Sequence, residues 1–120
     1  MAASAQADEL VPKQLYLYQQ GSELIASNAR RSTVDVLKLD AKEKVQDKVV
    51  ANAVAVIATN QRLIAYSAYT GAWDARRLDA GEQVVSLQAR DYSASVLTNQ
   101  RILNYNGRNG AWAARDRPVQ

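Results

Sequence analysis

The sequence repeats itself at a fixed spacing. Thr59-Asn60-Gln61-Arg62 recurs 39 residues later as Thr98-Asn99-Gln100-Arg101. The segments that follow stay in the same register without a gap, so that Gly71-Ala72-Trp73 recurs as Gly110-Ala111-Trp112. A spacing of about 20–50 residues is typical of proteins built from one repeated supersecondary unit. The repeat therefore constrains the fold more than any single residue does.

A third, earlier copy follows the same spacing. Leu39-Asp40-Ala41 aligns with Leu78-Asp79-Ala80, and Glu43 aligns with Glu82. The first and second copies agree best in their second halves, whereas the second and third agree best in their first halves. Structural repeats usually need three or more copies to bury a continuous core. Three copies are therefore enough for one folded domain.

The repeats divide the chain into a short N-terminal segment and a single repeat domain. At 120 residues the chain has the length of one domain. We assign residues 1–14 to an N-terminal tail or exchanged strand and residues 15–120 to one all-β repeat domain. Its three repeats run over about 15–53, 54–92 and 93–120.

The apolar pattern within each copy is that of β-strands. Ala55 to Thr59 is a short apolar run that ends at Asn60, a residue that favours turns. Strand-length segments every 8–12 residues or so, with turn signals between them, predict an all-β fold. Asn109-Gly110 is the strongest local turn signal, because this pair tolerates the positive φ angles of a two-residue hairpin loop. We expect each copy to be a four-stranded antiparallel meander.

Two segments resemble a known type of blade. Leu63 to Trp73 is similar to the part of many β-propeller blades in which an apolar strand passes through a Thr-Gly or Asn-Gly turn into a strand opened by tryptophan, and Ile102 to Trp112 fits as well. The first copy lacks both the glycine and the tryptophan at Arg31 to Val34. The resemblance covers residues 53–117 and implies propeller blades. A β-trefoil of three four-stranded units is the alternative.

Three blades predict a partner copy. A closed propeller has about 4–8 blades, and a half-ring would expose the apolar flanks of its end blades. Such patches are usually interaction surfaces, and cyclic dimers are the commonest oligomers. We therefore expect two chains to form a homodimeric six-bladed propeller, whereas a β-trefoil would be monomeric.

The chain ends suggest a strand exchange. The fourth strand of the last copy would begin past residue 120, and the matching strand type falls at residues 4–12. We expect this N-terminal strand to complete the last blade of the neighbouring chain by pairing along an open edge. The alternative is that Met1 to Asp8 is a disordered tail, as termini often are.

The composition excludes several kinds of chemistry. The chain has no cysteine and no histidine, which removes thiolate chemistry, the commonest metal ligand and every Ser-His catalytic arrangement. Carboxylates such as Glu43 and Glu82 are the only acid–base groups, and repetition gives them the same environment, whereas an acid–base pair needs two different ones. We expect no enzyme activity, no cofactor and no metal.

Charge and hydropathy limit the partners. The net charge is +3, but Arg76-Arg77 and Arg115-Asp116-Arg117 are too short for the basic stripe that nucleic-acid binding needs. No apolar stretch approaches the ~20 residues of a membrane-spanning helix. Ala3-Ser4-Ala5-Gln6-Ala7 resembles the small-residue end of a secretory signal, which slightly favours a periplasmic or secreted protein. We predict no nucleic-acid partner and no membrane span.

Three pairs of repeated residues are the candidates for ligand contact. The tryptophans would form equivalent platforms for sugar rings, and packing between blades is the favoured interpretation. The arginines would clamp a carboxylate, and a bond to a neighbouring blade, for example to Asp74 or Asp79, is favoured. The tyrosines are expected to be half-buried strand residues. The candidates are Trp73, Trp112, Arg62, Arg101, Tyr66 and Tyr105.

These observations predict a non-enzymatic binding or scaffold module that assembles as an oligomeric β-propeller. The first alternative is a lectin-like protein that binds glycans through the repeated tryptophans. A hydrolase that uses the central channel is the least favoured alternative.

Overall fold

The chain folds into antiparallel β-sheets. The computed structural model describes residues 13–117, which form eleven strands and no helix. The strands are β1 (Leu15–Gln20), β2 (Glu23–Asn28), β3 (Thr33–Lys38), β4 (Val45–Val50), β5 (Val54–Thr59), β6 (Arg62–Ser67), β7 (Ala72–Arg77), β8 (Val84–Arg90), β9 (Ser93–Thr98), β10 (Arg101–Asn106) and β11 (Ala111–Asp116). Because no helix occurs here, none is available in this part of the chain to cross a membrane.

Consecutive strands pair into three separate sheets. Sheet A contains β1-β2-β3, sheet B contains β4-β5-β6-β7, and sheet C contains β8-β9-β10-β11. Within each sheet, consecutive strands pair antiparallel, so each sheet is a meander. The predicted all-β fold of antiparallel meanders is confirmed.

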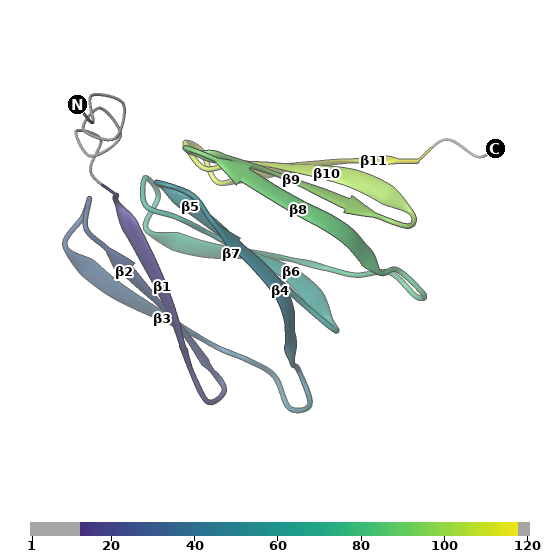
Figure 1. Ribbon diagram of the computed structural model, residues 1–120, viewed down its shortest axis with the longest axis horizontal. Helices are drawn as coiled ribbons and strands as arrows, with labels where there is room; N and C mark the ends of the chain where they lie inside the picture. Colours follow the sequence, from purple (N-terminus) through teal and green to yellow (C-terminus); the bar gives the residue numbers. More distant parts are fainter. Residues whose placement is uncertain (1–12, 118–120) are drawn as a thin grey trace, which may run out of the picture.

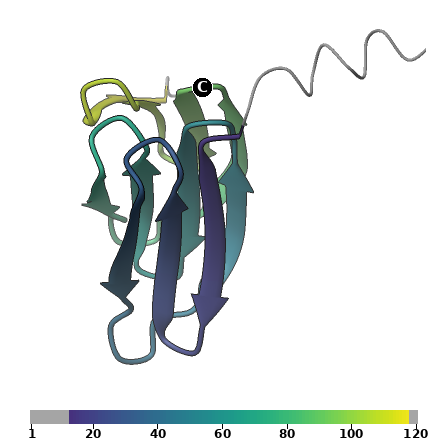
Figure 2. The same ribbon diagram turned by 90° about the vertical axis from the view of Figure 1, so that its left-hand side faces the viewer.

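The sheets follow one another in chain order, with sheet B between sheets A and C (Figures 1 and 2). One buried apolar cluster joins sheets A and B, and a second joins sheets B and C. This row of meanders is propeller-like. It is not the closed barrel of a β-trefoil, because sheets A and C lie against opposite faces of sheet B and do not meet in a common core.

The middle sheet is buried on both faces. Every residue of β5 is buried, and successive residues point to opposite faces. Val54 and Val56 pack in the cluster with sheet C, whereas Ala55 and Ile57 pack in the cluster with sheet A. This explains why Ala55 to Thr59 reads as a continuous apolar run rather than an alternating one.

The sheets do not coincide with the sequence repeats. Val45–Val50 closes the first repeat in the sequence, but this strand pairs with β5 of the second repeat. In the same way, β8 pairs with β9 of the third repeat. The breaks between sheets therefore fall in two linkers, 39–44 and 78–83.

This pairing corrects the prediction that the last blade lacks a strand. Sheet C already has four strands, because the preceding repeat supplies β8. Among residues 13–117, sheet A is the sheet with three strands. The positions one repeat before β4 are residues 6–11, so the predicted exchanged strand lies outside the described residues.

The turn prediction was also wrong in one place. Asn106 pairs with Ala111, so Asn109-Gly110 belongs to a four-residue loop and not to a two-residue hairpin. Gly110 ends this loop with a φ of 70°, a left-handed conformation that favours glycine, and its N–H donates to the Asn106 carbonyl. Asn60-Gln61, between β5 and β6, is a two-residue connection, as is its repeat Asn99-Gln100 between β9 and β10.

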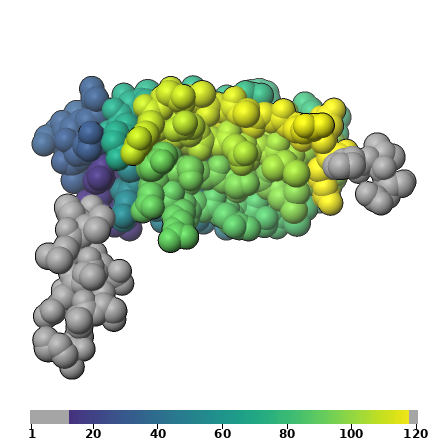
Figure 3. Space-filling model, turned by 90° about the horizontal axis from the view of Figure 1, so that it is seen from above, coloured from purple at the N-terminus to yellow at the C-terminus, as the bar shows by residue number. Residues whose placement is uncertain are grey.

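The row of sheets is more open than a compact domain. The radius of gyration is 15.1 Å and the principal extents are 49 × 35 × 26 Å, whereas a compact domain of this length has a radius of gyration of about 13–14 Å. Seen from above, sheet A lies at one end of the molecule and sheet C covers most of the rest of this face (Figure 3). Among residues 13–117, no further sheet packs on the outer face of sheet A or of sheet C.

Candidate functional site

The repeated Thr-Asn-Gln-Arg motif clamps the linker that enters its own sheet. In sheet C, the Glu82 carboxylate accepts hydrogen bonds from Thr98 Oγ1 at 2.6 Å and from Arg101 Nε at 2.8 Å. Arg101 Nη2 also bonds to Glu82, at 2.9 Å, which makes the ion pair bidentate. The Glu82 side chain is fully buried and that of Arg101 is 13% exposed.

The two amides of the motif hold the linker backbone. Asn99 Oδ1 accepts from the N–H of Gln83 at 2.8 Å, and Asn99 Nδ2 donates to the Gly81 carbonyl at 3.0 Å. Gln100 Nε2 donates to the Ala80 carbonyl at 2.9 Å. All four residues of the motif thus contact the linker between sheets B and C.

The arginine also reaches back to the preceding sheet. Arg101 Nη2 donates to the carbonyl of Arg77, the last residue of β7, at 3.0 Å. The guanidinium therefore bonds both to the linker and to the end of sheet B. This fixes where sheet C begins relative to sheet B.

The junction between sheets A and B is built in the same way. Glu43 accepts from Thr59 Oγ1 at 2.6 Å and from Arg62 Nε at 2.8 Å. Arg62 Nη2 donates to the carbonyl of Lys38, the last residue of β3, at 3.4 Å. Each clamp joins the linker of one repeat, in its second half, to the Thr-Asn-Gln-Arg turn of the next repeat, in its first half. The linker is thus the part shared by the first and second copies, and the turn is the part shared by the second and third copies.

The clamps keep their glutamates ionised. Burial alone would raise the pKa of Glu82, but the hydrogen bonds from Arg101, from the Asp79 backbone N–H and from Thr98 outweigh it and lower the pKa to about 2. Burial alone would also raise the pKa of Glu43, but the hydrogen bonds from Arg62, from Thr59 and from the Asp40 backbone N–H outweigh it and lower the pKa. A carboxylate held ionised in a bidentate pair is a structural element and is poorly placed to transfer protons.

The predicted arginine contacts are of the favoured kind but with different partners. We expected a bond to Asp74 or Asp79. Glu43 and Glu82 are the close partners instead, and Asp79 lies 4.0 Å from Arg101 Nε. The glutamates precede β4 and β8 directly, so their proximity depends on the linker path, which the sequence pattern did not define.

The repeated aromatic residues form two matching pairs between sheets. The ring centroids of Tyr66 and Trp73 are 4.9 Å apart, and those of Tyr105 and Trp112 are 5.1 Å apart. Both tyrosines are fully buried, so the prediction of half-buried tyrosines was wrong, and both tryptophans are half-buried. All four lie on the face of each sheet that packs against the preceding sheet. The six predicted ligand residues thus lie within two separate junctions and do not form one shared site.

The two tyrosine hydroxyls differ in their bonding. Tyr66 donates to Asp35 and accepts from Asn28 Nδ2, at 3.0 Å for the latter. The Tyr105 hydroxyl is buried without a hydrogen-bond partner among residues 13–117. Burial and the nearby Asp74 carboxylate raise the pKa of Tyr105 to about 12, although the nearby Thr70 and Ser67 side chains, which make no hydrogen bond of normal geometry with it, act in the opposite direction.

The free face of sheet A is apolar. Tyr16 and Tyr18 of β1 point to the side away from sheet B and are 44% and 57% exposed. On the same face, Val34 and Val36 of β3 are 66% and 50% exposed, with Ile25 between them and the tyrosines. We call this surface the A face. Its apolar side chains are contiguous across three strands, a property of interaction surfaces.

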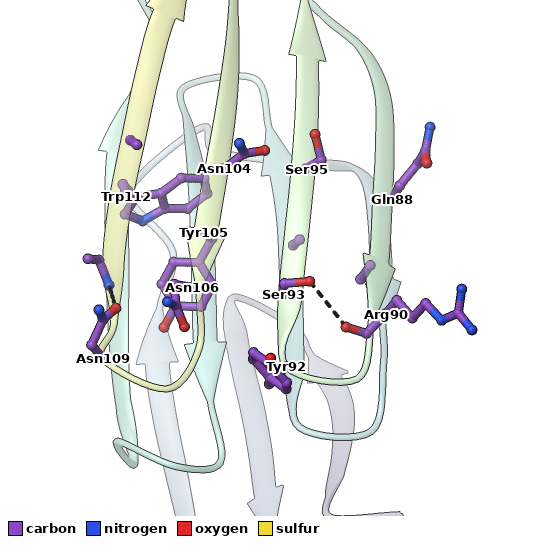
Figure 4. Close-up of a pocket in the computed structure, with 14 residues that line it drawn as sticks. Gln88, Arg90, Tyr92, Ser93, Ser95, Asn104, Tyr105, Asn106, Asn109 and Trp112 are labelled. Carbon is purple, nitrogen blue, oxygen red and sulfur yellow. Dashed lines mark hydrogen bonds between the residues drawn. The ribbon is translucent and has the colours of Figure 1, made fainter.

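The free face of sheet C carries polar side chains around a hollow, with Ile102 of β10 43% exposed on the same face. A pocket of about 780 Å³ lies over it. Figure 4 shows the side chains along neighbouring strands. We call this surface the C face, and its polar side chains are those of Gln88, Ser93, Ser95, Asn104 and Asn106.

Apolar end faces were predicted from the sequence, but not the residues that form them, and the polar side chains of the C face differ from that prediction. In β1 the letters Leu-Tyr-Leu-Tyr are apolar on both faces, so the pattern alone does not distinguish core from surface. The signal for the C face was present in the repeat: Val54 and Val56 of sheet B become Ser93 and Ser95 one repeat later. These are strand positions that change from apolar to polar.

Comparisons with known proteins give limited similarity. No protein-family model matches the sequence, and no curated protein matches it significantly. Among solved structures, the N-terminal domain of Nup159 is similar with a TM-score of 0.46 and 9% identity, covering 86% of this chain and 31% of that one. A chain from the S. cerevisiae complex of Dbp5 with Nup159, Gle1, IP6 and ADP is similar with a TM-score of 0.46 and 10% identity, covering 89% and 32%. This chain thus spans about one third of the length of either.

Proposed function

We propose that this protein is a non-enzymatic binding or scaffold module that assembles with a second copy of itself into a six-bladed β-propeller. The observation that carries the proposal is the contrast between the sheets. Sheet B buries both faces, whereas sheets A and C each bury one. The A face leaves Tyr18 at 57% and Val34 at 66% exposed, positions where sheet B has the buried Ile57 and half-buried Trp73.

The non-enzymatic part of the proposal rests on what the repeated polar residues do. Glu43 and Glu82 are committed to the clamps. Among residues 13–117 no group of acidic residues is placed to hold a metal ion. The repeats therefore build junctions between sheets, and the free faces are the surfaces left for partners.

Glycan binding is the second candidate function. The polar side chains around the pocket on the C face favour it. Against it, both tryptophan rings pack on a tyrosine and are half-buried, so they offer little open ring surface for a sugar. A glycan array with the wild-type chain and with Trp112→Ala separates the two functions. Glycan binding that the substitution abolishes supports the lectin.

The mass of the chain in solution tests the assembly. Light scattering coupled to size exclusion at micromolar concentration should give twice the chain mass of 13.2 kDa. Substitution of Tyr18 by glutamate should shift the mass to that of one chain, because it places a charge in the apolar A face. A wild-type mass of 13.2 kDa, that of a single chain, would contradict the proposal.

A further inference from the structure

We infer that Tyr16 and Tyr18 of one copy insert into the pocket on the C face of a second copy, so that the chains join head to tail. This inference rests on the self-assembly proposed above and specifies its contact surfaces. It assigns the pocket on sheet C to a second copy of this chain and not to a small molecule.

The geometry follows from the repeat. At both internal junctions, the face of one sheet packs on the opposite face of the next, and β5 of sheet B contacts β8 and β9 of sheet C. The C face corresponds by repeat position to the face of sheet B that packs on sheet C, while the A face corresponds to the face of sheet B that packs on sheet A. A further sheet that continued the row beyond sheet C would therefore present an A-type face.

Side-chain sizes change in opposite directions on the two free faces. On β9, Ser93 and Ser95 stand where β5 has the larger Val54 and Val56. On β1, Tyr16 and Tyr18 stand where β5 has the smaller Ala55 and Ile57. In a continued row β9 would lie against β1, as β5 lies against β9. The larger tyrosines of β1 in the second copy would then fill the volume that the smaller serines of β9 leave, as close packing requires.

The next strands along each sheet, β10 in sheet C and β2 and β3 in sheet A, show the reverse change in side-chain size. On β10, Asn104 and Asn106 replace the smaller Ala65 and Ser67 of sheet B. In sheet A, Ser27 and Val34 replace the larger Tyr66 and Trp73. The tyrosine–tryptophan pair that fills each internal junction is thus absent from the A face. The bulkier asparagines of the C face would fill part of the space that this leaves.

The polar groups of the C face match tyrosine. Within residues 13–117, the side chains of Gln88, Ser95 and Asn104 take part in no hydrogen bond, so they are free to bond an incoming group. A tyrosine supplies an apolar ring with a hydroxyl at its tip that both donates and accepts. Two C faces are poorly suited to each other, because each carries Arg90 and Arg115.

The clamp residues agree with a junction between chains. The positions of Thr59 and Arg62 are occupied in sheet A by Gln20 and Glu23. The residues that clamp one sheet to the next within the chain are therefore not repeated in sheet A.

Disulfide trapping tests this arrangement, because the chain contains no cysteine of its own. Tyr18→Cys and Ser95→Cys are prepared separately, mixed at equal concentration and oxidised mildly. We expect a disulfide-linked product of two chains in the mixture and none with either variant alone. The matched control replaces Ser95→Cys by Gln83→Cys, an exposed position in the linker before β8, and should give no linked product.

A second pair of variants tests the pocket without cross-linking. Ser95→Trp fills the pocket and should convert the assembly to single chains, whereas Ser95→Ala should leave the assembly intact. Circular dichroism of Ser95→Trp confirms that the sheets still form. An intact assembly in folded Ser95→Trp would overturn the inference.

The outcomes separate this inference from the proposed function. Linkage of Tyr18→Cys to itself would mean that two A faces pair, which overturns the head-to-tail contact and the closed propeller while self-assembly itself holds. Two-chain mass without linkage in the mixture also overturns it and places the contact elsewhere. A single-chain mass for the wild type overturns both.

Discussion

Arg101 Nε lies 2.8 Å from Glu82 Oε2, and this one pair connects a linker, a turn and the end of the preceding sheet. The same contact recurs one repeat earlier between Arg62 and Glu43. Because each arginine also bonds to the last carbonyl of the preceding sheet, the pair sets the position of consecutive sheets. The most similar parts of the sequence are thus the parts that hold one sheet to the next.

Removing the charge of Glu82 should destabilise the fold. Glu82→Gln leaves the largely buried guanidinium of Arg101 without its anion, and breaking a buried pair in this way costs about 3 kcal/mol. Urea unfolding at pH 7 measures the loss. Glu43→Gln should cost a similar amount, whereas Asp47→Asn, at an exposed position of β4, should change the unfolding free energy by less than ~0.5 kcal/mol. Equal stability of all three variants would contradict the clamp.

The clamps should also make the protein sensitive to acid. The pKa of Glu82 is lowered to about 2 in the folded chain from 4.5. A lowered pKa contributes stability that is fully present above the unfolded pKa and is lost as the pH falls through the folded pKa. Between pH 4.5 and 2 the wild type should therefore lose stability faster than Glu82→Gln. Parallel losses in the two proteins over this range would count against the assignment.

A methyl group at Gly107 should force sheets B and C apart. A Cβ at this position would overlap Val54 Cγ1 and the carbonyl oxygen of Tyr92. Gly107→Ala should destabilise by about 2 kcal/mol, because overpacking a close contact costs roughly 1–3 kcal/mol. Thermal unfolding gives the change. Ala29→Gly, at the same repeat position in sheet A, is exposed and should cost less than ~1 kcal/mol.

The two buried tyrosines should respond differently to loss of their hydroxyls. Tyr66→Phe removes the partner of both Asp35 and Asn28 and should cost about 1–2 kcal/mol. Tyr105→Phe removes a hydroxyl that has no partner among residues 13–117, and should be neutral or slightly stabilising. Chemical denaturation of the two variants side by side makes this comparison, and a larger loss in Tyr105→Phe would be inconsistent with the bonding described.

The sequence was sufficient to predict strands, meanders and the repeat, because these depend on local apolar patterns and turn residues. It did not reveal that β4 and β8 pair with the following repeat, since Val45–Val50 is equally compatible with either neighbour. It identified Arg62 and Arg101 as repeated contacts but not their partners, because Glu43 and Glu82 reach them only through the path of the linkers.

The free faces were the part least accessible from the sequence. Leu15, Tyr16, Leu17 and Tyr18 alternate between two apolar faces, and only the position of sheet B shows that Leu15 is buried while Tyr18 is exposed. The change from Val56 to Ser95 gains its meaning only when sheet C is seen to end the row. Which face of an end sheet is exposed depends on the tertiary arrangement of the sheets, whereas a repeat can be recognised from the sequence alone.

Small-angle X-ray scattering of the wild-type chain tests most directly whether the two free faces cover each other. A closed six-sheet assembly has twice the chain mass and the size of a compact particle of twice the length, with a radius of gyration of about 18 Å. An elongated particle of the same mass, with a clearly larger radius, would contradict ring closure. A single-chain mass with a radius near 15.1 Å would contradict the self-assembly itself.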